Sequence, residues 1–341
     1  MDDGRPGVGE TYAAWVPLAP DPSPSSSPAG PPPADRRTRE RRGIGYGLAA
    51  YGMWGAVPLF WPLVARAGSL EILAHRIVWS FLISVVLVVV SVRQGFWTRM
   101  ARRRTLLLLG SAAAIVSVNW GVYIWSVNHG HVVETALGYY INPILSILLG
   151  VVVLHERLSP MQWVSVGLAA VAVAVLTVDY GTLPWIALVL AVSFTAYGFI
   201  KNRLGAGAVD SLAVESALLT PFALVYLGWL ELTGRASFGH EGWGLSLLLV
   251  STGLITLVPL LFFASAATRL PLSTLGLLQY LAPTLQFVLG ISYFGESMSP
   301  GRWVGFGLVW LALVIMTTDG LLRARRNRAG VRGADVEPAA V

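Results

Sequence analysis

The sequence predicts an all-α membrane protein with ten transmembrane helices arranged as two inverted five-helix repeats. Three observations support this fold class: apolar segments of membrane-spanning length, a one-sided distribution of arginine among the loops, and similarity of the chain to itself at a fixed offset. Only 12% of the 341 residues are charged, whereas about a quarter is usual for soluble domains. Cysteine is absent, which excludes disulfides, thiol catalysis and cysteine metal sites.

The two ends of the chain differ in composition from the apolar segments. Residues 21–33 are rich in Pro and Ser and cannot bury enough apolar surface to fold. We therefore predict that residues 1–42 form a disordered cytoplasmic arm, and that residues 321–341 form a basic cytoplasmic tail. The arm lacks the apolar region of a signal peptide. Its five arginines between positions 36 and 42 would anchor the topology or add affinity for anionic lipid.

Ten apolar segments are long enough, or nearly so, to cross a bilayer, which takes about 20 residues. We expect spans at 43–65, 70–92, 106–127, 133–154, 161–178, 183–200, 211–232, 243–264, 272–294 and 302–320. Several of these segments are short, so tilted helices of uneven length are expected.

Lysine and arginine orient these spans. When the loops are assigned alternately to the two sides, with the N-terminus inside, 20 of the 24 Lys and Arg residues fall inside. Three fall outside, and one, Arg76, lies within a span. Cytoplasmic loops carry the excess of positive charge, so both termini are predicted to be cytoplasmic. A missed helix would invert every later assignment, so the asymmetry also supports ten spans.

The chain resembles itself at an offset of 140 residues, without a gap. The matching pairs include Tyr140 and Tyr280, Pro143 and Pro283, Glu156 and Glu296, Ser159 and Ser299, Trp163 and Trp303, and Asp179 and Asp319. Apolar composition alone does not place Pro, Glu and Trp in one register. Residues 43–180 and 181–320 are therefore predicted to be two five-helix repeats that share one membrane body.

An odd number of spans in each repeat gives the second repeat the opposite orientation in the membrane. Inverted repeats are typical of secondary transporters, whose two similar halves exchange conformations and expose a central site to each side in turn. Two glycine pairs with GxxxG spacing, at 43 and 47 and at 301 and 305, would allow close packing of helices within the monomer.

Several segments also carry a resemblance to a known family. They are residues 71–81, 119–120, 126–129, 134–143, 266–276 and 279–284. These segments resemble the EamA group of the drug/metabolite transporter superfamily. The resemblance covers roughly residues 43–320. It implies a ten-helix transporter fold of two EamA-like repeats with a central cavity, and it implies no particular substrate.

Ionisable residues inside spans are costly in a bilayer and are therefore functional candidates. The second span opens with Glu71, His75 and Arg76, and the first two share one helix face. The three could form a gate or bind a substrate anion, with Arg76 as the cation and His75 or Glu71 carrying a proton. They could equally form a buried ion pair that fixes packing, which is the favoured interpretation for Glu71. The offset places Glu215 opposite His75, where it could carry a proton or pair with Arg76 in one conformation.

Polar and aromatic residues near mid-span prolines form a second group of candidates. Proline frees a carbonyl and kinks a helix, so Pro143 and Pro283 are candidate hinges. The further residues that could line the substrate or proton path are Asn119, Trp120, Tyr140, Asn142, Gln279 and Tyr280. For the aromatic residues, packing or anchoring at the membrane interface is the alternative. For each proline, local structural adjustment is the alternative.

The sequence thus favours a secondary transporter of a small metabolite or drug-like solute in the bacterial cytoplasmic (inner) membrane. It would work by alternating access, with export as the expected direction, coupling to protons left open, and a monomeric or homodimeric state. The alternative is a non-transporting membrane enzyme or sensor on the same fold. Catalytic or phosphate-loop motifs are missing from the sequence. We expect no enzyme activity, cofactor, metal or nucleic-acid partner; the solute and the lipid bilayer are the expected partners.

Overall fold

The computed structural model describes residues 33–90, 102–155, 158–204 and 208–334. The packing described below is that of the unit Glu40–Val341. The described residues are helical, with no strand among them. The all-α fold class predicted from the sequence is therefore confirmed.

Eleven α-helices follow one another in the described residues. They are α1 (Pro33–Ala56), α2 (Gly68–Val90), α4 (Arg103–Asn128), α5 (Val132–Leu154), α6 (Pro160–Tyr180), α7 (Trp185–Leu204), α8 (Ala208–Leu232), α9 (Trp243–Ala267), α10 (Leu272–Leu278), α11 (Leu281–Ser292) and α12 (Pro300–Ala334). Two 3-10 segments, η1 (Val57–Leu59) and η2 (Trp61–Ala67), connect α1 to α2.

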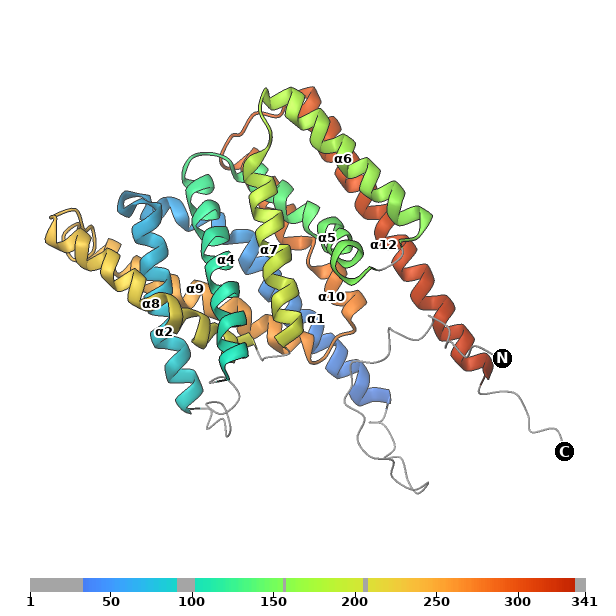
Figure 1. Cartoon of the computed structure of the whole chain (residues 1–341), viewed down its shortest axis with the longest axis horizontal. Coiled ribbons are helices and arrows are strands. Elements are labelled where there is room, and N and C mark those ends of the chain that lie inside the picture. The colour runs from blue at the N-terminus through green and yellow to red at the C-terminus, as the bar shows by residue number, and fades with distance from the viewer. Residues whose placement is uncertain (1–32, 91–101, 156–157, 205–207, 335–341) are drawn as a thin grey trace, which may run out of the picture. The chain divides into compact units, whose positions relative to one another are not determined.

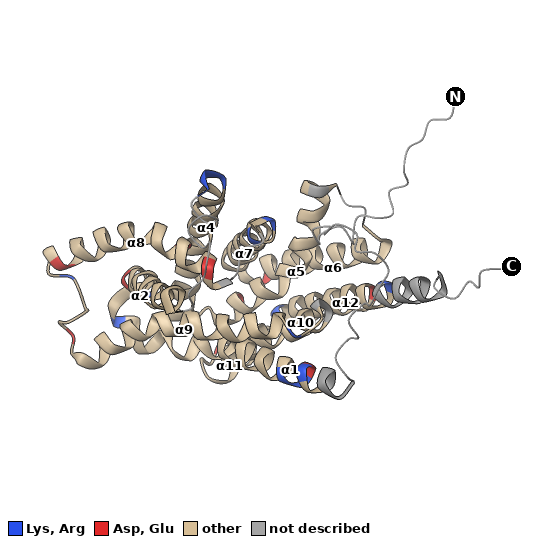
Figure 2. Cartoon of the chain, turned by 90° about the horizontal axis from the view of Figure 1, so that it is seen from below, with Lys and Arg blue, Asp and Glu red and all other residues tan. Residues whose placement is uncertain are grey.

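Nine segments in the described part of the chain are helical, long and apolar enough to cross a membrane. The middle turns of these helices carry few charged residues. Lys and Arg lie at helix ends, such as the first turn of α4 and the last turn of α7 (Figure 2). Figure 1 shows these two ends on the same, lower side of the bundle. Alternating helix directions thus bring basic residues that are far apart in sequence to one side.

The first predicted span, 43–65, is wrong as a single continuous helix. Helix α1 ends at Ala56, and the chain continues through η1 and η2 to Ala67. Pro58 and Pro62 stand in the first turns of η1 and η2. A proline has no N–H to donate to the preceding turn, so the hydrogen-bond ladder of α1 cannot pass through them.

The ninth predicted span, 272–294, is also divided. Helix α10 ends before Gln279, and α11 begins after Tyr280. Pro283 lies in the first turn of α11, where its missing N–H cannot bond to the carbonyl of Gln279. In α5, by contrast, Pro143 stands inside an uninterrupted helix. The two candidate hinges therefore differ in local geometry although the offset equates them.

Both ends of the chain contain more helix than the sequence predicts. Residues 1–32 lie outside the described residues, but α1 already begins at Pro33, within the arm predicted to be disordered. Proline is favourable in the first turn of a helix, and the Arg and Glu residues that follow are good helix formers. At the other end, α12 continues to Ala334 through most of the predicted tail.

Helices at equivalent positions of the two predicted repeats pack against each other: α2 on α8, α5 on α11, and α6 on α12. Helices α6 and α12 lie side by side along their length (Figure 1). Two hydrogen bonds across this pair repeat at the 140-residue offset. Ser159 Oγ donates to Asp319 Oδ2 over 3.0 Å, and Ser299 Oγ donates to Asp179 Oδ1 over 2.6 Å. Each serine also accepts the backbone N–H three residues later and so caps the helix it precedes.

Glycine allows the close approach of α12 to α6. A Cβ atom on Gly301 would lie 2.3 Å from Asp179 Oδ1, and one on Gly305 would lie 2.4 Å from Leu176 Cγ. The second GxxxG pair therefore lies at a contact between helices of the same chain. The large core cluster beside it contains Leu176, Phe287 and Phe306.

Candidate functional site

Arg76 lies on α2 among side chains from three other elements. Its Nε–H donates to Thr256 Oγ1 of α9 over 2.8 Å. Its guanidinium carbon is 4.0 Å from the ring centroid of Trp120 on α4 and 5.5 Å from that of Trp61 on η2. Tyr139 and Tyr123, the latter one turn after Trp120, interact electrostatically with the guanidinium. We refer to Arg76, Trp61, Trp120, Tyr123 and Thr256 as the Arg76 cage.

The Arg76 cage contains a buried positive charge without an acidic partner. Arg76 is only 9% exposed, and no carboxylate among the described residues forms an ion pair with it. A cation over an aromatic ring gains about 0.5–2 kcal/mol, whereas an unpaired buried charge costs several kcal/mol. The two aromatic faces therefore offset only part of the cost of burying this charge.

Glu71 and His75, predicted to act with Arg76, have a different environment. Glu71 Oε1 accepts the backbone N–H groups of Ser237 and Phe238 over 2.8 and 3.1 Å, which ties α2 to the loop between α8 and α9. His75 Nε2 is 3.9 Å from Glu71 Oε1, and the His75 ring lies 4.7 Å from the Phe238 ring. Glu71 thus bonds to the backbone of the loop, while Nε2 of His75 has no hydrogen-bond partner in the described structure.

Glu215 on α8 belongs to a second polar cluster. Its Oε1 is 2.8 Å from Lys201 Nζ and its Oε2 accepts from Tyr197 OH over 3.1 Å, both from α7. Lys201 Nζ also bonds to Ser211 Oγ. In this conformation Glu215 pairs with Lys201 and not with Arg76. Lys201 lies one residue beyond the predicted span 183–200, so the sequence indicated neither Lys201 nor Tyr197 as a partner of Glu215. The signal that could have found them is their spacing of four residues, which puts both on one helix face.

Asn119 and Asn142 both bond to α7. Asn119 Nδ2 donates to Leu190 O over 3.0 Å and to Ser193 Oγ over 2.9 Å. Asn142 Oδ1 accepts from Thr195 Oγ1 over 2.6 Å, directly before Pro143. Both amides therefore join a helix of the first predicted repeat to α7 of the second. The next residue after Asn119, Trp120, supplies a face of the Arg76 cage.

The candidates around the divided ninth span form a third group. The hydroxyl of Tyr140 lies 2.7 Å from Thr284 Oγ1, and that of Tyr280 lies 3.5 Å from Thr317 Oγ1. Gln279 caps the end of α10, where its backbone N–H donates to Leu275 O over 3.0 Å. None of these candidates bonds to Arg76 or Glu215 in the described structure. Nearby, Gln286 is buried, donates to Trp54 O over 3.1 Å and leaves its Oε1 without a partner; the sequence analysis did not single it out.

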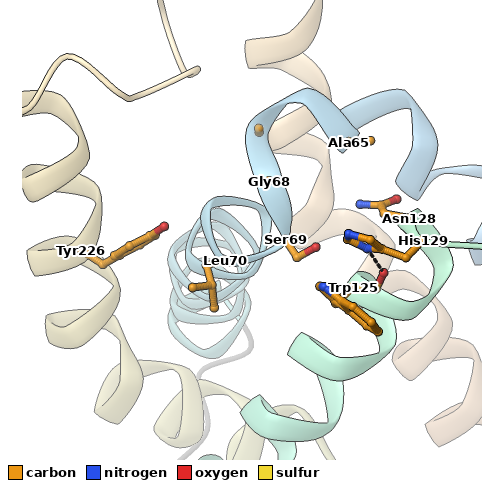
Figure 3. Close-up of a pocket in the computed structure, with 9 residues that line it drawn as sticks. Ala65, Gly68, Ser69, Leu70, Trp125, Asn128, His129 and Tyr226 are labelled. Carbon is orange, nitrogen blue, oxygen red and sulfur yellow. Dashed lines mark hydrogen bonds between the residues drawn. The ribbon is translucent and has the colours of Figure 1, made fainter. Parts of the chain in front are cut away.

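A pocket of about 540 Å³ opens beside the first turn of α2 (Figure 3). Its polar lining includes Ser69, Asn128 and His129. His129 Nδ1 lies 2.7 Å from Trp125 O, and the two rings stack at 4.4 Å. Both side-chain polar atoms of Asn128 are buried without a partner in the described structure. Figure 3 shows Asn128, His129 and Trp125 on one wall and Tyr226 on the opposite side of Leu70.

The pocket and the Arg76 cage use the same elements. Segment η2 supplies Trp61 to the cage and Ala65 to the pocket, and α4 supplies Trp120 to the cage and Trp125 to the pocket. On α2, Arg76 lies eight residues after Gly68, which is about 12 Å along a helix. The pocket therefore lies on the same elements as the cage, about two helical turns from Arg76, but none of the cage residues lines it.

Glu296, in the loop before α12, caps the start of α5. Its carboxylate accepts the backbone N–H groups of Val132 and Val133, the latter over 3.0 Å. Burial raises the pKa of Glu296 to about 7, although these two N–H donors and Arg302 act in the opposite direction. In the loop before α5, burial and the neighbouring His129 lower the pKa of His131. No group of three or more metal-binding side chains occurs among the described residues.

Comparison with known proteins gives consistent matches. The model of the EamA-like transporter family matches residues 41–178. Protein RarD of Streptomyces exfoliatus is 56% identical over 297 residues, which is 86% of this chain and 94% of that protein. A Vibrio cholerae protein named "Uncharacterized transporter" is 40% identical over 302 residues, covering 84% of this chain and 97% of that protein. A solved structure described as "Crystal structure of protein" has a TM-score of 0.50 and 16% identity, and covers 81% of this chain and 97% of that one; this likeness concerns the fold alone.

Proposed function

The chain belongs to the EamA-like transporter family and is a multi-pass membrane transporter, and from this premise we propose that it is a secondary carrier working by alternating access. Its cargo is a small metabolite or drug-like solute, which it exports across the bacterial cytoplasmic membrane. The two moving halves are the repeats 43–180 and 181–320, with both termini in the cytoplasm.

The observation that carries this proposal is the pairing of α2 with α8. These helices are equivalent under the 140-residue offset and pack on each other. Each holds buried ionisable groups: Arg76 and His75 on α2, and Glu215 on α8. Charged groups inside a membrane are expensive and mark substrate or ion pathways. Inverted topology puts the first group toward the outside and the second toward the cytoplasm, so each can serve one of the two access states.

Solute and proton have separate places in this scheme. The Arg76 cage and the pocket beside the first turn of α2 hold the solute on the outer side. On the cytoplasmic side, Glu215 gives up its ion pair with Lys201 and takes up a proton. A buried carboxylate that loses its cation favours the protonated form. An enzyme or a sensor is not proposed, since neither a motif nor a cluster of the described residues supports one.

Purified protein reconstituted into liposomes tests the proposal. Liposomes loaded with a pH-sensitive dye are exposed to a panel of small organic solutes with and without a pH gradient. We expect at least one solute to enter faster with a gradient than without, and the variant Glu215→Gln to lose this acceleration while keeping solute exchange at equal pH. Absence of solute flux in every condition, from protein that is folded and inserted, would contradict transport. Flux that is insensitive to pH in the wild type would contradict proton coupling alone.

A further inference from the structure

The Arg76 cage has hydrogen-bond donors for which no described residue supplies an acceptor. A guanidinium has five N–H donors, and in the described structure only Nε–H of Arg76 has an acceptor, Thr256. The four remaining N–H groups belong to the two terminal nitrogens, which form the fork that binds a carboxylate through two parallel hydrogen bonds. The cage therefore presents a two-pronged donor without an acceptor.

Two neighbouring side chains add to this surplus. Trp61 Nε1 and the Tyr123 hydroxyl are buried and have no hydrogen-bond partner in the described structure. Trp61 is fully buried and Tyr123 is 6% exposed. A buried polar group without a partner costs about 1–3 kcal/mol. Indole N–H is a donor only, so the missing partner at Trp61 is an acceptor, as it is at Arg76.

The charge and shape of the cage restrict the class of ligand. Its net charge is positive, since the acid closest along α2, Glu71, bonds to the loop at Ser237 and Phe238. The guanidinium lies over the rings of Trp120 and Trp61, and these apolar surroundings favour a ligand whose body, beyond its anionic group, is apolar or aromatic. A cationic ligand would be repelled by the positive charge of Arg76, and a neutral ligand would leave the charge of Arg76 unpaired.

We infer that the Arg76 cage binds the carboxylate of a small organic anion with an apolar or aromatic body, and that this anion is the class of solute carried. The statement about the carried solute rests on the proposed transport function; the statement about binding does not. The carboxylate pairs with the two terminal nitrogens of Arg76 while Thr256 holds Nε, and Trp61 Nε1 supplies a further donor.

Ligand binding to the full chain in detergent tests the inference. The probes are benzoate, benzamide and benzylammonium, which share a ring and differ in charge. Tryptophan fluorescence reports binding because Trp61 and Trp120 both contact the guanidinium of Arg76. We expect saturable binding of benzoate, binding of benzamide weaker by about tenfold or more, since one lost charged contact is worth about 1.4 kcal/mol or more, and no binding of benzylammonium. Inorganic phosphate should not compete with benzoate, because it lacks the apolar body.

Variants connect the binding to Arg76. Arg76→Gln should lose benzoate binding, and Arg76→Lys should weaken it while keeping the charge, because an ammonium lacks the planar fork. The matched control is Arg235→Gln, which removes an exposed arginine that also lies over a tryptophan, Trp229, at 5.4 Å; it should bind benzoate like the wild type. If Arg76→Gln does not fold, Arg76→Lys and the probe series in the wild type still decide.

The outcomes separate this inference from the proposed function. Three results would each overturn the inference. Benzamide could bind as tightly as benzoate, inorganic phosphate by itself could compete with benzoate, or Arg76→Gln could bind benzoate fully. Benzoate binding that depends on Arg76 without flux in liposomes would reject carriage and keep the site. Flux of neutral solutes without benzoate binding would reject the anion site and keep carriage.

Discussion

Removal of one partner from the buried Lys201–Glu215 pair should destabilise the protein more than removal of both. Glu215 is 1% exposed, and its carboxylate bonds to Lys201 and Tyr197. Lys201→Met leaves that carboxylate buried without a cation, which typically costs about 3–5 kcal/mol. Glu215→Gln should cost less, about 1–3 kcal/mol, because the Lys201 side chain is 19% exposed and can extend toward water. The double variant should lie within about 2 kcal/mol of the wild type, so the coupling energy should be at least about 2 kcal/mol.

Unfolding of the purified chain in mixed micelles, followed by tryptophan fluorescence, measures these free energies of unfolding. The matched control is the ion pair His240–Glu231, whose side chains are 60% and 59% exposed. Its double-mutant cycle should give a coupling energy below about 1 kcal/mol. A coupling energy for Lys201 and Glu215 as small as that of the control would refute the reasoning, since it would mean that the two groups do not interact in the membrane.

Three further predictions concern the bundle around the site. The pKa of Glu296 is raised above the ordinary value of 4.5 to about 7, so the folded state binds its proton more tightly than the unfolded state. The stability this provides is present below pH 4.5 and is lost as the pH rises through 7. Tm should therefore fall between about pH 5 and 8, and it should fall less in Glu296→Gln. If Tm of Glu296→Gln depends on pH as steeply as that of the wild type, this assignment is rejected. Gly305→Ala should cost about 1–3 kcal/mol by collision with Leu176, whereas Gly307→Ala, which meets nothing within 4 Å, should be neutral or slightly stabilising in the same unfolding assay. Asn119→Leu should cost about 1–3 kcal/mol, because the carbonyl and hydroxyl it serves on α7 lose their buried donor; an unchanged Tm would contradict that role.

Much of the fold follows from local patterns in the sequence. Hydropathy located the spans because a bilayer-spanning helix must be long and apolar, and the 140-residue register equated helices that do pack together, such as α2 with α8. The two divided spans were less predictable, because proline can either interrupt a helix, as before Pro283, or be accommodated within one, as at Pro143. Packing decides between these outcomes, and packing is not a local property.

The candidate site was predictable only in part, for a related reason. The spacing of Glu71 and His75 on one helix face shows directly in the sequence, and burial of Arg76 followed from its place in a span. The hydrogen bond from Arg76 to Thr256 joins residues 180 positions apart, and no periodicity indicates it. Likewise, Glu215 on α8 pairs with Lys201, which lies just beyond the predicted span 183–200, and no local pattern indicates this pair.

The hydrogen bonds between α6 and α12 have a consequence for how such a chain can assemble. Ser159 and Asp179 are 20 residues apart, so about 30 Å of helix separates them, and they cannot reach each other. Each instead bonds to a residue of the other repeat, Asp319 or Ser299. A lone five-helix repeat would therefore satisfy neither its serine nor its aspartate unless it met an inverted copy of itself. Joining both copies in one polypeptide turns that encounter into an intramolecular event, with an effective concentration that no longer depends on expression level.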